Sequence, residues 1–154
     1  MHNNLANEKN VGMGLIAFEK DGLWAVKKED TGEILCEPEF DSIEHFSNGY
    51  AVFTRGKRKG FINAQGKKVF EKYYDVRSFV NGFAAVRLFF ERWTFIDEMG
   101  MELTKKTYQE VGDFNLAGYA VVREDDGTCN VIDKYGVEVV TGILSPRDPI
   151  EVDF

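Results

Sequence analysis

Short apolar runs, separated by turns that contain glycine or asparagine, recur along most of this chain in a fixed order. The clearest copy spans residues 59–87. Within it, an apolar run at 60–63 precedes a turn that ends at Gly66, a second run passes through Val69, and a closing run begins at Phe83 after Asn81-Gly82. Runs of this kind, bounded by such turns, are typical of β-strands. The pattern predicts a unit of three short strands.

The stretches on both sides are imperfect copies of this unit. Related units span residues 24–53 and 93–122, and a partial fourth begins at residue 129. Steps of 34, 34 and 36 residues separate the turn glycines, which are Gly32, Gly66, Gly100 and Gly136. Self-similarity at a fixed period indicates one supersecondary unit that buries its apolar faces by packing on its neighbours. We therefore expect an all-β fold built from about four tandem repeats of roughly 34 residues.

The two ends of the repeat array are complementary. The run Leu15–Phe18 resembles a closing strand without its unit, whereas the fragment at 131–140 lacks a closing strand. Pairing between them would close the array into a propeller- or toroid-like ring that exposes no sheet edge. The alternative is an open stack of hairpins with frayed ends. The chain then divides into a polar leader (1–13), a repeat domain (14–142) and an extended C-terminal tail (143–154) in which prolines follow Ser145 and Asp148.

These repeated motifs resemble the WG-repeat family, whose units combine a Trp-Gly opening, an Ile-Asp-x-x-Gly turn, an aromatic-Asp pair and a Phe-x-x-Gly-x-Ala-x-Val close. The matching residues are Trp24, Ile96-Asp97 with Gly100, Ile132-Asp133 with Gly136, Tyr74-Asp75, and the run from Phe79 to Val86. Trp and Gly never coincide, since the opening pairs are Trp24-Ala25, Lys59-Gly60, Trp93-Thr94 and Cys129-Asn130. The resemblance covers about residues 14–141. It implies a bacterial interaction module without shared catalytic residues.

Three aspartates recur at fixed places in their units: Asp75, Asp97 and Asp133. A short carboxylate at such a position can accept hydrogen bonds from nearby turn amides. We expect a structural role for all three, because an active site is usually built once.

Composition supports the β-strand interpretation and narrows the classes of partner. Thirteen Phe, six Tyr and fifteen Gly against three Pro favour short strands joined by glycine turns. The net charge of -7 argues against nucleic acid, whose affinity for proteins comes mostly from Lys and Arg, and suits a basic protein partner. No run approaches the ~20 apolar residues of a membrane span, and the first ten residues lack a signal-peptide run, so a cytoplasmic location is expected. Cys36 and Cys129 are expected to be buried free thiols.

Candidate catalytic chemistry is sparse. Nucleophilic catalysis needs a nucleophile beside a base, and the two histidines are His2 in the leader and His45, three residues after Ser42 in a connecting loop. The acidic stretch 124–127 ends in glycine and is explained by a hairpin turn. No clustered His or paired Cys suggests a metal, so we expect neither enzymatic activity nor a cofactor.

The hairpin tips are where the copies differ. One tip carries Leu88, Phe89 and Phe90, with Arg92 and Trp93 just beyond, a composition typical of interface anchors. A second tip is a basic knob formed by Arg55, Lys57 and Arg58. We take both tips as candidate contacts for a protein partner, and the apolar tip also as a candidate contact for self-association. In the alternative, Phe89 and Phe90 fold back onto the core or the tail.

The functional expectation is a protein–protein interaction module, of the size and charge of a small inhibitor or immunity-type protein that covers a basic surface. The alternative is a small-ligand or glycan binder with its site in the central depression of a closed array, because binding sites often occupy the mouths of barrels.

Overall fold

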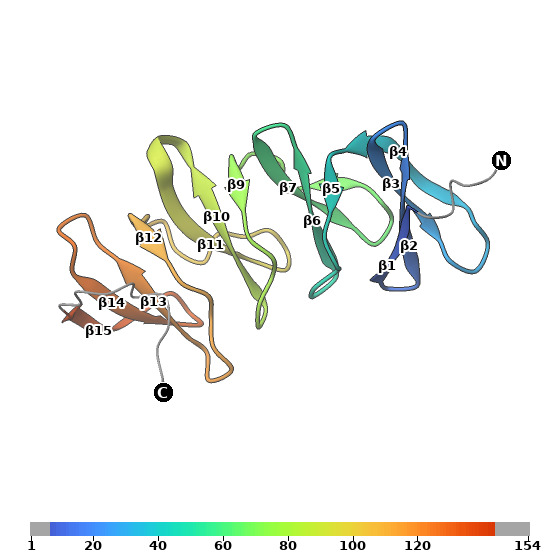
Figure 1. Ribbon diagram of the computed structural model, residues 1–154. Coiled ribbons are helices and arrows are strands. Elements are labelled where there is room, and N and C mark those ends of the chain that lie inside the picture. Colours follow the sequence, from blue (N-terminus) through green and yellow to red (C-terminus); the bar gives the residue numbers. More distant parts are fainter. Residues whose placement is uncertain (1–6, 144–154) are drawn as a thin grey trace. The chain divides into compact units, whose positions relative to one another are not determined.

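The computed structural model describes residues 7–143, and these residues form an all-β fold of four antiparallel sheets (Figure 1). The chain divides into two compact units, residues 1–71 and 72–154, which are described separately. The first unit contains β1 (Glu8–Gly12), β2 (Leu15–Lys20), β3 (Leu23–Lys28) and β4 (Ile34–Phe40) in one sheet, and β5 (Ser42–Ile43), β6 (Tyr50–Arg55), β7 (Arg58–Asn63) and β8 (Lys68–Val69) in another.

The second unit also contains two sheets. One consists of β9 (Asp75–Val76), β10 (Phe83–Leu88) and β11 (Arg92–Asp97), with the short 3-10 turn η2 (Phe89–Glu91) between the last two. The other consists of β12 (Glu110–Val111), β13 (Tyr119–Arg123), β14 (Cys129–Asp133) and β15 (Glu138–Ile143). No helix among the described residues is long and apolar enough to cross a membrane.

Each sequence repeat contributes to two sheets. The closing strand of one repeat pairs with the opening strand of the next, as in β6 with β7, where Val52 lies opposite Phe61. The same pairing joins β2 to β3, β10 to β11 and β13 to β14. This confirms that closing and opening strands meet in tight hairpins, whose tips are the four segments that differ most between copies.

Besides the three strands that the sequence predicted, each repeat has a further short strand just before its closing strand: β5, β9 and β12. The buried aromatic of each repeat lies just before this short strand. Phe40, Tyr73 and Tyr108 occupy this place and are at most 3% exposed. The aromatic-Asp motif was therefore matched at Tyr74, one residue after the buried aromatic Tyr73. Tyr73 fills the core position, while Tyr74 is half-buried. Either ring of two adjacent tyrosines could enter the core. Tyr73 does so because it lies three residues before buried Val76 and six before buried Phe79.

Two of the three recurring aspartates cap turns as expected. The Oδ1 atom of Asp97 accepts hydrogen bonds from the amides of Met99 and Met101, both at 2.9 Å. Asp133 does the same for Tyr135 and Val137, at 2.9 and 3.0 Å. Asp75 is different: it starts the short strand β9, its Oδ1 atom accepts from the Val76 amide, and its other oxygen lies 4.0 Å from Arg87.

The N-terminal prediction needs two corrections. Residues 8–12, assigned to the polar leader, form β1 and pair with β2 across a turn in which Gly12, Met13 and Gly14 all have positive φ. Val11 is 1% exposed, so this segment contributes to the core. Because β2 then has β1 on one edge and β3 on the other, its predicted pairing with residues 131–140 is not formed, and those residues pair within their own sheet. The predicted tail lies outside the described residues, apart from Ile143 at the end of β15.

Each unit has its own apolar core, formed where its two sheets pack face to face. In the first unit this core includes Val26, Phe40, Ile43 and Ile62; in the second it includes Phe95, Tyr108, Phe114 and Ile132. Full burial of each such side chain stabilises the fold by about 1.5–3 kcal/mol. Cys129 is buried and Cys36 half-buried, both as free thiols, and burial raises the pKa of each.

Candidate functional site

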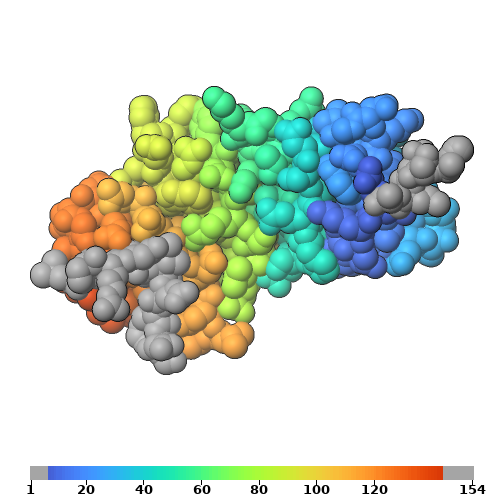
Figure 2. All heavy atoms as spheres, in the orientation of Figure 1, coloured from blue at the N-terminus to red at the C-terminus, as the bar shows by residue number. Residues whose placement is uncertain are grey.

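The hairpin tip between β10 and β11 carries the most exposed aromatic pair. Phe89 is 65% exposed and Phe90 is 91% exposed. Figure 2 shows the yellow-green atoms of this part of the chain projecting at the upper edge of the view. The two rings therefore do not fold back onto the core. The other half of that alternative, packing against the C-terminal tail, lies outside the described residues.

The backbone of this tip is strained. Phe90 (φ 60°, ψ 29°) and Glu91 (φ 58°) both lie in the left-handed region, and the Arg92 amide donates a hydrogen bond to the carbonyl of Phe89. Leu88 lies opposite Arg92, so the loop has three residues, of which the last two are left-handed. Two consecutive left-handed turn residues are normally Asn-Gly or Asp-Gly, because other residues cost roughly 1–2 kcal/mol each in this conformation. The tip between β2 and β3 follows that rule with Asp21-Gly22. The sequence Phe-Glu therefore holds the aromatic side chains at the tip at the expense of stability.

A third aromatic ring supports the exposed pair. The rings of Tyr74 and Phe89 meet edge to face with centroids 4.7 Å apart, and Phe89 and Phe90 have centroids 6.2 Å apart. Together with the side chains at the base of the hairpin they line a shallow groove of about 210 Å³, formed by Tyr74, Arg87, Leu88, Phe89, Phe90 and Glu91. The second tyrosine of the Tyr73-Tyr74 pair is thus part of the surface, which the sequence motif did not reveal.

Arg92 and Trp93 are held within the second unit. The guanidinium of Arg92 donates to Thr107, to Oγ1 at 3.1 Å and to the carbonyl at 2.8 Å, and it forms an ion pair with Asp125. Trp93 is half-buried against the core, with the guanidinium of Arg77 5.3 Å from its ring centroid. Both side chains are thus engaged within the second unit. Of the apolar candidates, Phe89 and Phe90 are the most exposed.

The ion pair between Arg92 and Asp125 links two hairpins. Asp125 lies in the tip between β13 and β14, so the aromatic tip and this acidic tip lie at the same end of their sheets (Figure 1). Glu124 of the acidic tip is engaged by Lys106 and Asn130, both at 2.6 Å, whereas the side chain of Asp125 is 72% exposed. The sequence identified these tips only as two separate loops, because Arg92 and Asp125 lie 33 positions apart and no local pattern indicates their contact.

The basic tip belongs to the first unit. Arg55 is 2.7 Å from the carboxylate of Glu39, which also accepts from Lys68, and the hydrogen bond from Lys68 lowers the pKa of Glu39. The amide of Gly56 donates to Asp41 at 2.6 Å. Lys57 and Arg58 are exposed. The carboxylate of Glu39 thus balances the charge of Arg55 within the knob.

The weak Ser42–His45 candidate has a packing explanation. The His45 ring lies against Gly12, where a Cβ atom would come within 2.8 Å of Cε1, and its Nδ1 is 2.9 Å from the carbonyl of Phe46. The ring therefore fills the space beside the turn that follows β1.

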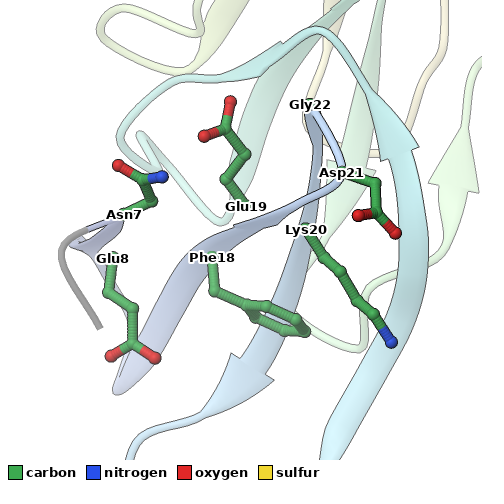
Figure 3. A pocket seen from close by; sticks show the side chains of 7 residues that line it. All are labelled: Asn7, Glu8, Phe18, Glu19, Lys20, Asp21 and Gly22. Carbon is green, nitrogen blue, oxygen red and sulfur yellow. The ribbon is translucent and has the colours of Figure 1, made fainter. Parts of the chain in front are cut away.

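A larger hollow of about 570 Å³ lies beside β1 and the tip of the β2–β3 hairpin. Figure 3 shows Glu8, Glu19 and Asp21 pointing in different directions around Phe18. Glu8 is also ion-paired with Lys27, whose ammonium lies 5.2 Å from the Phe18 ring centroid. Within residues 7–143 no three His, Cys, Asp or Glu side chains form a group that could hold a metal ion. The hollow therefore lacks the convergent polar groups of a ligand site.

The fold is similar to that of β-propeller proteins. Hsv2p of Kluyveromyces lactis matches with 15% identity and a TM-score of 0.52 over 87% of this chain and 49% of its own. A eukaryotic initiation factor matches with 14% identity and a TM-score of 0.52 over 92% of this chain and 45% of its own. The WD40 β-propeller domain of Doa1 matches with 14% identity and a TM-score of 0.39 over 83% and 50%. At these identities the similarity concerns the fold alone, and this chain spans about half the length of the matched chains.

Sequence comparison adds the family. No curated protein matches the chain. Three consecutive stretches, residues 29–57, 60–88 and 93–127, match the family described as WG containing repeat, and together they make up more than half of the sequence. Each stretch contains one of the first three turn glycines, Gly32, Gly66 and Gly100. The chain therefore belongs to the WG-containing β-repeat family.

Proposed function

We propose that this chain is a non-enzymatic protein–protein interaction module whose principal contact is the tip Leu88–Glu91. The observation that carries the proposal is the combination of the 91% exposed Phe90 with a left-handed backbone at the same residue. Both features oppose solubility or stability in the free protein. A partner that covers the aromatic pair would remove the first of these costs.

The acidic character of the chain supports a basic partner. With a net charge of -7, the protein attracts positively charged surfaces at long range and associates with them faster. A small acidic module of this kind suits the role of an inhibitor or immunity-type protein that covers a basic surface. The exposed aromatic rings then supply the desolvated contacts that hold such a complex together.

The other functional expectation, a small-ligand or glycan site, has less support among the described residues. A small-ligand or glycan site was expected in the depression of a ring closed by residues 15–18, but β2 pairs with β1 and β3 instead. The groove beside Phe89 has a volume of about 210 Å³ and is open. It is better suited to one side chain of a protein partner than to an enclosed small molecule.

An affinity capture from the native organism, compared between variants, tests the proposal. Phe90→Ala removes an exposed ring without touching the core, and we expect it to weaken capture of a stoichiometric partner by about 2 kcal/mol, or roughly thirtyfold. Phe89→Ala should have a similar effect, with some loss of stability because its ring contacts Tyr74. Leu116→Ala is the matched control, since Leu116 is 94% exposed in another loop of the same unit. Equal capture by the parent, Phe90→Ala and Leu116→Ala would refute the proposed role of the tip.

A further inference from the structure

The groove at the aromatic tip and the exposed ring beside it form one surface. Tyr74, Arg87 and Phe89 line the groove, whose volume of about 210 Å³ is that of one large side chain. Phe90 also lines it and is 91% exposed. In a two-fold symmetric contact the same surface of each copy meets the other, so each copy inserts and receives the same group. A surface that contains both an exposed ring and a recess for one ring therefore fits a second copy of itself.

Two charged residues that line the groove complement each other between copies. Glu91 is exposed and forms no ion pair with another described residue. The ion pair of Arg87 with Asp75 is long, since the Nε atom of Arg87 lies 4.0 Å from the carboxylate oxygen. Each copy thus offers one carboxylate and one guanidinium whose charges are poorly balanced within the described part of the chain.

The positions of these two residues suit a reciprocal contact. Glu91 directly follows Phe90, so it accompanies that ring into a groove. Arg87 lines the groove that receives the ring. When Phe90 of one copy enters the groove of the other, a carboxylate therefore approaches a guanidinium, and symmetry forms the same pair a second time. Opposite charges across a contact favour it and fix its register.

We propose that two copies of this chain associate through this surface, with Phe90 of each copy in the groove of the other and Glu91 of each copy beside Arg87 of the other. A contact confined to two hairpin tips is smaller than the roughly 1,200–2,000 Å² of stable interfaces. The net charge of -7 on each copy also opposes their approach. The dimer is therefore weak and forms at high protein concentration.

This dimer goes beyond the proposed function and does not depend on it. A different protein that covers Phe90 and a second copy of the chain need the same groove and the same ring, so the two contacts exclude each other. Self-association then shields the aromatic pair from solvent while the partner is absent, and binding of the partner dissociates the dimer.

Sedimentation velocity of the full chain, from micromolar to millimolar concentration, tests the inference. We expect the average mass of the parent to rise with concentration toward twice that of one chain. Phe90→Ala should raise the Kd of the dimer at least about tenfold. Leu116→Ala removes another side chain that is more than 90% exposed and should leave the Kd unchanged.

Exchange of the two charges tests the pairing itself. Glu91→Arg and Arg87→Glu each place like charges opposite each other in the dimer, and each should raise the Kd at least about tenfold. In an equimolar mixture of these two variants every pair again joins opposite charges, so the mixture should dimerise as the parent does. Lys105→Glu mixed with Glu91→Arg is the control, because Lys105 is exposed and the net charges are the same. This control mixture should stay weaker, since one arginine still faces another.

Urea unfolding curves show whether each variant is folded. Phe90→Ala and Glu91→Arg change exposed side chains, whereas Arg87→Glu places a second carboxylate opposite Asp75 in the β9–β10 pair. If Arg87→Glu does not fold, Arg87→Gln takes its place. Its mixture with Glu91→Arg should then dimerise more tightly than Glu91→Arg alone.

The outcomes separate this inference from the proposed function. A parent that stays monomeric at every concentration overturns the inference, whether the groove is then filled by another protein or by residues 144–154 of the same chain. If Phe90→Ala dimerises as the parent does, or if the mixture of charge variants does not restore the dimer, the contact is wrong. If the dimer depends on Phe90 but capture of a partner does not, the dimer stands and the proposed function fails.

Discussion

The ammonium of Lys27 lies 2.6 Å from the carboxylate of Glu8 and 5.2 Å from the centroid of the Phe18 ring. Lys27 pairs with Ile16 in the β2–β3 hairpin, and the corresponding positions of the β6–β7 and β13–β14 hairpins are Ile62 and Ile132. Both isoleucines are fully buried. The first sheet thus carries a lysine where later sheets carry a core residue, which is how the terminal units of repeat proteins remain soluble.

Lys27→Ile should therefore promote self-association. The substitution removes the ion pair with Glu8 and leaves Phe18 and Ile16 beside a new apolar side chain on an otherwise half-exposed sheet face. Light scattering after size-exclusion chromatography should show an average mass that rises with concentration more than that of the parent. Lys67→Ile, at an exposed turn, is the matched control. Identical behaviour of the two variants would argue against a capping role for Lys27.

Replacing the strained tip should stabilise the protein while weakening partner binding. The double change Phe90→Asn with Glu91→Gly supplies the residues that two consecutive left-handed turn positions favour, and should raise the free energy of unfolding by about 1–2 kcal/mol in urea denaturation. Phe90→Ala keeps a Cβ atom at the same φ and should leave stability nearly unchanged. If both variants stabilise equally, exposed apolar surface and not backbone conformation is the source of the effect.

Two turn glycines with nearly the same φ allow the stability cost of backbone strain to be measured apart from the cost of steric crowding. Gly32 has φ +76° with open space around it, so Gly32→Ala should cost about 1 kcal/mol of stability. Gly66 has φ +78°, and a Cβ atom there would lie 2.8 Å from Leu35 Cβ and 3.0 Å from the Leu35 carbonyl oxygen. Overpacking should add about 1–3 kcal/mol to the loss in Gly66→Ala. Equal shifts of the urea midpoint would contradict the close approach to Leu35.

Acid should weaken the second unit through Glu138. This carboxylate accepts hydrogen bonds from Lys106 at 2.8 Å and from the Tyr108 hydroxyl at 2.9 Å, and the bond from Lys106 is the main cause that lowers the pKa of Glu138. A lowered pKa means that the stabilisation is complete above the ordinary glutamate pKa of about 4.3 and is lost as pH falls through the lower native value.

The measurement is urea denaturation of the parent and of Glu138→Gln at pH about 7 and about 3. The difference in unfolding free energy between the two proteins should be larger near neutrality and shrink in acid. A difference that is the same at both values would show that the charge of Glu138 contributes nothing. Hydrogen bonds to Glu124 and Glu138 raise the pKa of the Lys106 amine. Lys106 therefore stays charged, and keeps its side of these bonds, up to alkaline pH.

Local chemistry explains which features could be predicted. The strands, the hairpin tips and the caps at Asp97 and Asp133 follow from alternation, from turn glycines and from carboxylates that bond amides two and four residues away. All of these interactions lie within a few residues, so repeated sequence predicts repeated structure. The Phe89-Phe90 tip was open to two interpretations, because local sequence does not show whether a distant segment of the chain covers these rings.

The sequence by itself therefore determined an all-β repeat array, its approximate period and the tips at which the copies differ. Tertiary structure alone decided that Tyr73 and not Tyr74 enters the core, that residues 8–12 complete the first sheet, and that Arg92 binds Asp125 of the next hairpin. The physical reason is distance along the chain. Packing and ion pairing between separate hairpins depend on which faces meet, and alternation within one strand carries no information about that choice.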